Sequence, residues 1–457
     1  MIKFFLIFLL IINIGSEHQN TNPTSPERTL FYNTNIVDVK NGRIIKNQHV
    51  LIEDGVIKKI SRNLENLGEF DNRIDASGKY LMPGLAEMHA HIPQPPVSEQ
   101  RIKDVLFLYL ANGITTIRGM LGHPSHLELR EQTNTGNIIG PRIFTSSPSF
   151  NGNSIPSPEI AEKKVREYKQ TGYDFLKIHP GLDRASFDAM VKTAREENIE
   201  FAGHVPAQVG IRPALNSGYA SIDHVDGFLE GLVPQSANVD PEQNGFFGYN
   251  FTPLADTEWI DDLVALARKN KVWIVPTESL FTKWFAPVKV EDLLALPEMK
   301  YMEPETLQNW ERVKKDFMND PEFSEEQWKK FSLIRKELIK NLSENGHGML
   351  LGSDSPQLFN VPGFSIHKEM KDMAGAGMSN LEILRSGTIN PAIFFGMEDR
   401  FGQVKEGLDA DLVLLNSNPL ENLENISEPY GVMRQGKWYS REMIDRKLNE
   451  IASRAAN

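Results

Sequence analysis

The sequence predicts an α/β protein in which a (β/α)8 TIM-like barrel carries a small β-sandwich domain built from both chain ends. Between residues 79 and 399, eight short apolar runs alternate with helix-like stretches, as in parallel β/α units that close into a barrel. Residues 29–78 instead contain short alternating runs and Asn-Gly and Asp-Gly pairs that favour hairpin turns, and residues 400–440 have a similar texture. One barrel of about 250 residues plus a smaller domain and insertions accounts for the 457 residues.

The first residues predict export. MIKFFLIFLLIINIGS, residues 1–16, has one lysine followed by a mostly apolar run from Phe4 to Ile14 and then small residues. This run is too short for a transmembrane helix, which needs about 20 residues, and it suits a secretory signal peptide. A buried N-terminal helix is the alternative, but residues 17–28 are polar and typical of a disordered tether. We therefore expect a periplasmic or secreted protein without a stable membrane anchor.

Composition excludes several classes of function. The net charge of -12 argues against a nucleic-acid partner, which would require a basic face. The absence of cysteine excludes disulfides, thiolate metal sites and cysteine nucleophiles. Any bound metal must therefore use nitrogen and oxygen ligands.

The expected domain organisation follows these patterns along the chain. In order, we expect a signal peptide (1–16), a disordered tether (17–28), the first part of the small sandwich (29–78), the barrel (79–399), the second part of the sandwich (400–440) and a C-terminal helix (441–457). Two insertions interrupt the barrel. Residues 226–259 are rich in Gly, Asn, Pro and aromatics, and residues 290–345 are charged and helical with periodic apolar positions.

The run LMPGLAEMHAHIP contains His89 and His91 after an apolar stretch typical of a buried strand. Side chains at i and i+2 of a strand point to the same face, so both imidazoles would approach one point. That arrangement suits a metal ion, although two histidines near a strand end can also be ordinary polar residues. Further ligands downstream would favour the metal.

Such residues follow at the ends of later apolar runs. The eight runs end near His91, Arg118, Thr145, Lys177, His204, His224, Pro276 and Asp354. Because active sites of these barrels lie at the C-terminal ends of the strands, the histidines, Lys177 and Asp354 are candidates for one site. His204 and His224 can each supply one nitrogen ligand, and Asp354 can bind metal and accept a proton. Lys177 could form a carbamate with carbon dioxide or remain a plain lysine paired with an acid.

Taken together, these residues resemble the metal-dependent amidohydrolase superfamily, specifically its imidazolonepropionase-like and prolidase-like branch. The resemblance extends from about Thr29 to Tyr439. It includes MPGLAEMHAH, GITTIRGM, DFLKI, the two separate histidines, LLGSD, HKEMKDMAGAGMSNLEILRSGTINPAIFFGM and GQVKEGLDADLVLL.

The resemblance implies a site with two divalent metals, with zinc expected. His89 and His91 would bind the more buried metal with Asp354, His204 and His224 would bind the second, and carbamylated Lys177 would bridge them. A bridging hydroxide would attack the substrate, and Asp354 would pass the proton to the leaving nitrogen. The implied reaction is hydrolysis of a C–N bond in a small amide, cyclic amide or Xaa-Pro-type dipeptide.

Two further residues are candidate substrate contacts. His179, two residues after Lys177, is unexpected at that place in the family, and it either contacts substrate or metal or only lines the mouth. Arg118 is the best candidate for binding a substrate carboxylate. A mononuclear deaminase or cyclic-amidine hydrolase on the same barrel and a non-catalytic exported binding protein remain alternatives, and a homo-oligomer is compatible with the sequence.

Overall fold

The computed structural model describes residues 27–456. The expected signal peptide and the tether up to residue 26 lie outside the described residues. Within the described part, none of the helices has the length and apolar character that crossing a membrane would require.

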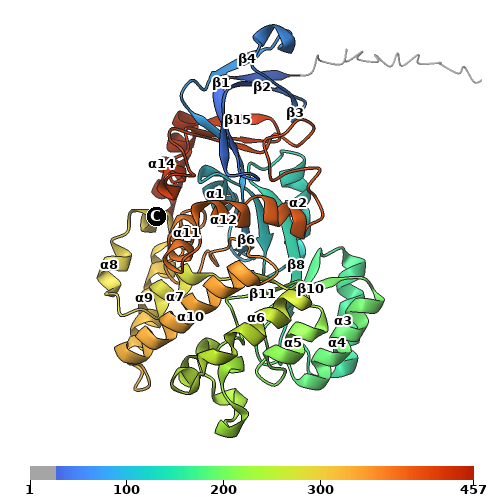
Figure 1. The fold of residues 1–457 in the computed structure, drawn as a ribbon, viewed down its shortest axis with the longest axis vertical. Helices are drawn as coiled ribbons and strands as arrows, with labels where there is room; N and C mark the ends of the chain where they lie inside the picture. The colour runs from blue at the N-terminus through green and yellow to red at the C-terminus, as the bar shows by residue number, and fades with distance from the viewer. Residues whose placement is uncertain (1–26, 457) are drawn as a thin grey trace, which may run out of the picture.

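Seven parallel strands form the barrel sheet, and each pairs with the next strand in chain order (Figure 1). They are β6 (Leu85–Ala90), β7 (Ile114–Gly119), β8 (Arg142–Phe150), β9 (Phe175–Ile178), β10 (Glu200–Gly203), β11 (Ser221–Asp223) and β12 (Trp273–Val275). All six residues of β6 and of β7 are buried, as expected for strands enclosed by helices. The predicted barrel is confirmed.

The eighth predicted strand is a bridging segment, residues 348–355, that nearly closes the barrel. Parallel bridges join Met349 to Ile274 and Ser355 to Ala90. Glycine permits the close approach, because a Cβ at Gly352 would lie 2.7 Å from the backbone nitrogen of His89. The segment therefore places Asp354 beside the end of β6.

β8 is longer than the sequence predicted. It does not end near Thr145 but continues to Phe150, with an irregularity between Ser146 and Ser149 in its pairing with β9. Pro148 lies inside this irregular stretch, where its missing N–H costs no ladder hydrogen bond. As a result, Ser149 lies opposite Lys177 at the barrel end.

Helices follow most of the strands. They are α1 (Glu99–Ala111), α2 (Pro124–Asn134), α3 (Pro158–Thr171), α4 (Arg184–Glu196), α5 (Ile211–Ser217), α6 (Ile260–Lys269), α7 (Glu278–Trp284), α11 (Ser365–Gly375), α12 (Asn380–Ser386) and α13 (Ile389–Phe394). Side-chain caps mark several starts: Ser98, Ser157 and Asp183 accept hydrogen bonds from first-turn backbone N–H groups of α1, α3 and α4.

The two insertions differ in structure. Residues 226–259 contain short 3-10 turns, η2 (Glu230–Leu232), η3 (Gln235–Ala237), η4 (Pro241–Gln243), η5 (Phe246–Leu254) and η6 (Thr257–Trp259). The later insertion folds into α8 (Val290–Leu294), η7 (Pro297–Tyr301), α9 (Pro304–Met318) and α10 (Glu325–Asn345). In Figure 1, α10 crosses the barrel side as one long helix.

A separate sheet is built from both chain ends, in the order β15-β14-β13-β5-β1-β2-β3, with β4 also paired to β1. Its strands are β1 (Arg28–Asp38), β2 (Arg43–Glu53), β3 (Val56–Ser61), β4 (Asn72–Asp75), β5 (Tyr80–Pro83), β13 (Leu412–Leu415), β14 (Gly431–Arg434) and β15 (Lys437–Ser440). Short turns η1 (Leu64–Leu67) and η8 (Leu423–Ile426) and helix α14 (Arg441–Ala455) complete this region. The sheet has a core of its own, which includes Phe31, Ile52 and Leu412.

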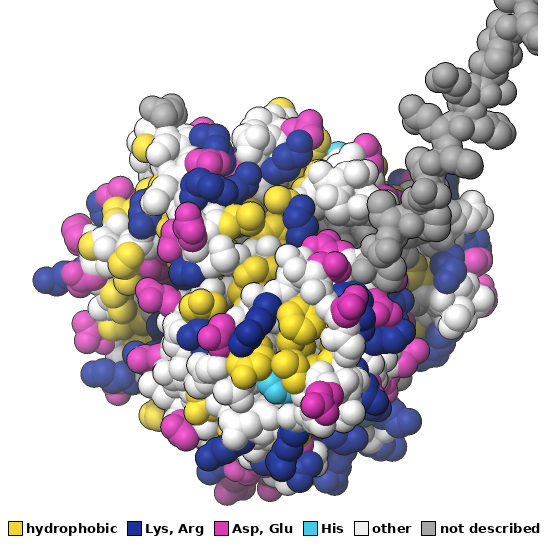
Figure 2. Space-filling view, turned by 90° about the horizontal axis from the view of Figure 1, so that it is seen from above, with side chains coloured by type: hydrophobic (Ala, Val, Ile, Leu, Met, Phe, Trp, Pro, Cys, Tyr) yellow, Lys and Arg dark blue, Asp and Glu magenta, His cyan; other side chains and the backbone are white. Residues whose placement is uncertain are grey.

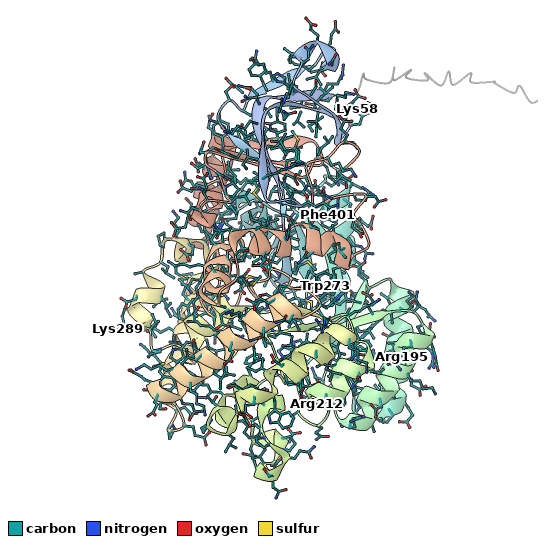
Figure 3. All side chains as sticks on the ribbon, in the orientation of Figure 1. Lys58, Arg195, Arg212, Trp273, Lys289 and Phe401 are labelled. Carbon is teal, nitrogen blue, oxygen red and sulfur yellow. The ribbon has the colours of Figure 1, made fainter. Side chains whose placement is uncertain are left out.

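The small sheet lies at the amino ends of the barrel strands. Gly84, just before β6, donates its N–H to the carbonyl of Asp411, and Arg142, the first residue of β8, pairs with Asp409 at 2.6 Å. The carboxyl ends of the strands therefore face away from this sheet. In Figure 3, Lys58 marks the small sheet and Arg212 the opposite half of the molecule. Figure 2, seen from the small-sheet end, shows charges of both signs interspersed with small apolar areas.

Candidate metal centre

Three of the predicted ligands meet at the carboxyl end of the barrel. His89 lies in β6, His91 follows that strand, and Asp354 lies in the bridging segment. The Nε2 atom of His91 is 2.6 Å and that of His89 is 3.4 Å from Oδ1 of Asp354. One ligand atom from each residue lies within 4.8 Å of the others, which is the geometry of a group that can hold a metal ion.

The other predicted ligands adjoin this group. The ring centroid of His224 is 4.5 Å from that of His89 and 4.6 Å from that of His204. Lys177 is fully buried, and its Nζ lies 3.8 Å from Oδ2 of Asp223. Among the described residues, that amine has no hydrogen-bond partner. Burying an amine without a hydrogen-bond partner is energetically unfavourable. The space next to Lys177 Nζ therefore suits a further group that would interact with this amine.

Neighbouring oxygens lie beside Nδ1 of three histidines and form hydrogen bonds with His204 and His224. The Nδ1 atoms of His89, His204 and His224 lie 3.2 Å from Asp223 Oδ2, 3.0 Å from Asp226 Oδ2 and 2.8 Å from Thr277 Oγ1, respectively. Metal-binding histidines characteristically use one ring nitrogen for the ion and the other for such a partner. With Nδ1 of His204 and His224 engaged in hydrogen bonds, Nε2 of these two rings is the nitrogen left for a metal. The residues present therefore fit a metal centre.

A buried arginine from α10 holds the backbone beneath His224. Arg335 donates to the carbonyl oxygens of His224 at 2.8 Å and Pro276 at 3.2 Å, and it pairs with Glu278 at 2.9 Å. Its guanidinium carbon lies 3.4 Å from the ring centroid of Phe281. The second insertion thereby fixes the ends of β11 and β12.

The site perturbs the pKa values of its titratable groups. Burial lowers the pKa of Lys177 to about 8, although Asp223 and Asp354 act in the opposite direction. For Asp354, burial raises the pKa, but His89 and His91 outweigh burial and the net shift is downward. Burial, reinforced by Lys177, lowers the pKa of His179. The site thus increases the neutral fraction of the Lys177 amine, which is still mostly protonated at pH 7, and favours an ionised Asp354 carboxylate.

The two candidate substrate contacts occupy different places. Arg118 is fully buried inside the barrel, where it donates to Met88 O, Ser221 Oγ and Asp223 Oδ1. Arg118 has no exposed surface on which to bind a substrate carboxylate, so the predicted role is not supported, and its hydrogen bond instead positions Asp223. His179 is half-buried at the mouth, with its ring stacked 5.1 Å from that of His204.

The first insertion covers one side of the centre. The ring of Phe247 lies 5.3 Å from that of His224 and 5.8 Å from that of His204, and it packs against Phe281 at 4.9 Å. Its backbone is left-handed, with φ of 55°, which is unfavourable for a bulky residue. Phe247 therefore presents an apolar wall to the centre.

Several supporting residues were not found by sequence reasoning. Asp223 and Asp226 flank His224 in SIDHVDG, so carboxylates close to a candidate ligand were an available signal. Thr277 and Arg335 gave no local signal, because each acts through a contact with His224. That residue lies 53 positions from Thr277 and 111 positions from Arg335 in the chain.

Comparison with known proteins agrees with this geometry. Residues 80–439, most of the chain, match the amidohydrolase family. The chain belongs to that family. It is accordingly an enzyme, and the family hydrolyses C–N bonds.

Three relatives of this amidohydrolase illustrate a distant similarity in sequence. An ochratoxinase from Aspergillus niger is 20% identical over 86% of this chain and 82% of its own. A bottromycin amidohydrolase superposes with a TM-score of 0.71 at 22% identity over 93% of this chain and 90% of its own. A putative prolidase from Bifidobacterium longum gives a TM-score of 0.65 at 23% identity over 93% and 99%, respectively. Because the sequence identities are as low as 22% and 23%, the similarity to the solved structures shows a shared fold and nothing more.

Proposed function

We propose that this amidohydrolase is a metal-dependent enzyme that cleaves the C–N bond of a small amide, cyclic amide or Xaa-Pro-type dipeptide. The observation that carries the proposal is the convergence of four histidines, Lys177 and Asp354 at one end of the barrel, with His204 and His224 oriented by hydrogen bonds through Nδ1. A barrel that only bound a ligand would have no need of Asp354 in this setting. The prolidases and the ochratoxinase among its relatives support amide-type substrates.

The proposed centre takes two divalent metals, with zinc expected. His89, His91 and Asp354 would hold one metal, His204 and His224 the other, and Lys177 as a carbamate would join them. A metal pair supplies a nucleophile from water near neutral pH and polarises the carbonyl under attack. The carbamate would form when neutral Nζ attacks carbon dioxide and releases a proton, and the lowered pKa and unpartnered amine of Lys177 support this step.

The chain itself would move the proton. Asp354 lies between His89 and His91, and His91 Nε2 is 2.6 Å from its Oδ1. These contacts favour the ionised carboxylate, which can accept the proton of the attacking water and pass it to the leaving nitrogen. Phe247 would exclude water from the side of His204 and His224.

A mononuclear deaminase or cyclic-amidine hydrolase is a second candidate. It is favoured by the tight group of His89, His91 and Asp354, which forms without Lys177, His204 or His224. The metal content of the purified protein distinguishes the two proposals, because the binuclear enzyme binds two ions per chain and the alternative binds one.

The function is tested by amine release from Xaa-Pro dipeptides, other dipeptides and N-acyl amino acids with zinc-loaded protein. Asp354→Asn should lower the rate by about 100-fold or more, because it removes the proton acceptor and a metal ligand. Asp316→Asn, which alters an exposed ion pair on α9, is the matched control and should retain full activity. If Asp354→Asn matches the control on every active substrate, the mechanism is wrong.

We also propose that the protein acts outside the cytoplasm, in the periplasm or medium. The support is the sequence of residues 1–16 alone. Fractionation of cells that express the full chain, compared with a chain beginning at Thr29, tests this. Equal retention of both forms in the cytoplasm would contradict export.

A further inference from the structure

An uncharged cavity of about 560 Å³ opens beside the centre, between the loops that follow β8 and β9. His179, Ser149, Asn151 and Asn153 supply its polar side chains, and none of the residues that line it is charged. Two glycines bring the loops together, since a Cβ at Gly152 would lie 2.3 Å from the carbonyl oxygen of Gly181. The cavity is therefore a preformed, neutral part of the barrel mouth.

The orientation of the Asn151 amide is fixed by backbone groups. Its Oδ1 accepts hydrogen bonds from the backbone nitrogens of Asn153 at 2.9 Å and Ser154 at 3.0 Å. Because Oδ1 must be the acceptor, the amide nitrogen is the atom that faces Ser149. Asn151 Nδ2 accordingly donates to Ser149 Oγ at 2.9 Å.

That bond favours one arrangement of the proton shared by Ser149 and His179. Ser149 Oγ is 2.6 Å from Nδ1 of His179, and either atom can be the donor in principle. If the only ring proton were on Nδ1, Ser149 Oγ would accept two hydrogen bonds, one from Asn151 and one from the ring. The hydroxyl proton of Ser149 could then not be donated to His179. If the hydroxyl donates, Nδ1 is the acceptor and Nε2 must carry a proton. A doubly protonated ring also has a proton on Nε2.

The ring is held in position for this donor. The backbone nitrogen of His179 donates to the carbonyl of Phe150 at 2.9 Å, and the ring stacks on that of His204. Within residues 27–456, no hydrogen bond to Nε2 is formed, and the half-buried ring lines the cavity. With the proton on Nε2, an oriented N–H lies at the mouth beside the candidate metal ligand His204.

We propose that His179 is a substrate-binding residue that donates its Nε2 proton to a neutral carbonyl oxygen of the substrate, with Ser149 and Asn151 as positioning residues. A carbonyl is the favoured acceptor because the cavity has no lysine or arginine to pair with a carboxylate. The inference rests on the proposed hydrolytic function and narrows its substrates to compounds that place a carbonyl in this cavity.

Kinetics test the donor. His179→Leu should lower kcat/KM by about 10- to 100-fold, and His179→Gln, which can supply an amide N–H, should recover part of the loss. Ser149→Ala should give a loss of about 3-fold or more, since it frees the ring to adopt either tautomer. His347→Leu, an exposed histidine next to Trp273, is the matched control and should remain fully active. Equal rates for His179→Leu and the control would overturn the proposal.

Matched substrates test the acceptor. A dipeptide and its C-terminal amide should suffer the same loss in His179→Leu, because the bonded oxygen is a carbonyl in both. A loss confined to the free acid would show that the acceptor is a carboxylate and would overturn this part of the inference.

A spectroscopic readout is independent of turnover. In ¹⁵N-histidine-labelled full-length protein, the signal that is missing from His179→Gln identifies residue 179. Wild-type protein should show protonated Nε2 and unprotonated Nδ1, and Ser149→Ala should shift this pattern toward a mixture. A wild-type ring protonated only at Nδ1 would contradict the relay. The failures are distinguishable. Loss of activity in Asp354→Asn but not in His179→Leu contradicts only this inference. Absence of hydrolysis with the expected tautomer contradicts the proposed function, and the substrate role of His179 with it, but leaves the hydrogen-bond arrangement of Asn151, Ser149 and His179 supported.

Discussion

Three residues of the centre or next to it have a strained backbone. His224, Thr277 and Asp354 have φ values of 65°, 49° and 61°, in the left-handed region that non-glycine residues seldom adopt. Such conformations cost on the order of 1–3 kcal/mol each and persist where surrounding contacts enforce them. Here the enforcing contacts are hydrogen bonds at the centre, between Thr277 and His224 and between Asp354 and His91.

Thr277→Val should weaken metal binding. Valine keeps the shape and β-branching of threonine but removes the hydroxyl next to His224 Nδ1, so the ring loses the contact that selects Nε2 as the ligand. Loss of such a partner lowers metal affinity by about 10- to 100-fold. Competition with a chromogenic chelator, followed as metal retained per chain, measures the effect.

Thr282→Val is the control for this substitution. Its hydroxyl contacts Asp372 and Lys368 on α11 and none of the candidate ligands. The variant should retain metal like the parent. If Thr277→Val also retains it, Thr277 has no part in orienting His224.

Among the elements, α10 connects the second insertion to the centre. Arg335→Met should lower the free energy of unfolding by about 3–5 kcal/mol, because Glu278 is left as a buried charge without its partner. The double variant Arg335→Met, Glu278→Gln should recover part of this loss. Denaturant unfolding of the three proteins measures the differences.

The exposed pair on α9 provides the comparison. Arg312→Met removes the partner of Asp316, where both side chains are more than half exposed, and should cost less than about 1 kcal/mol. A similar cost for Arg312→Met and Arg335→Met would show that α10 does not anchor the strand ends.

The same elements show what the sequence could predict. The barrel, the family and the clustering of candidate ligands were predictable, because His-x-His, Lys177 and Asp354 each follow a recognisable apolar run. The extension of β8 past Thr145 was not, since it depends on an irregular pairing with β9 that no local pattern encodes. Arg335 resembled any charged residue of an amphipathic helix, and only packing reveals that it is buried.

At the scale of the whole molecule, support and chemistry lie at opposite ends of the barrel. The small sheet is joined to the starts of the strands through a buried charge network, in which Asp411 pairs with Arg142 at 3.2 Å and Arg434 at 3.1 Å. The loops at the other end carry the centre and the two insertions. Substrate preference can therefore change in the loops without disturbing the sheet.

Stability of the whole molecule should depend on pH through Glu369, a fully buried carboxyl on α11. Burial is the main cause that raises its pKa from 4.5 to about 8, although the N–H of Ser279 favours the charged form. Between pH 4.5 and about pH 8, Glu369 keeps a proton in the folded protein that it has released in the unfolded chain. The free energy of unfolding therefore falls as pH rises through this window, and the contribution of Glu369 is lost above pH 8.

Glu369→Gln removes this titration and should flatten the pH dependence. Between about pH 5 and about pH 8.5, the variant should lose less stability than the parent, by at least about 1 kcal/mol. Urea unfolding at a series of pH values measures this, with Glu398→Gln at an exposed position as the control. Because glutamine preserves size and cannot ionise, a slope in Glu369→Gln as steep as in the control would mean that the carboxyl is already charged in the folded protein.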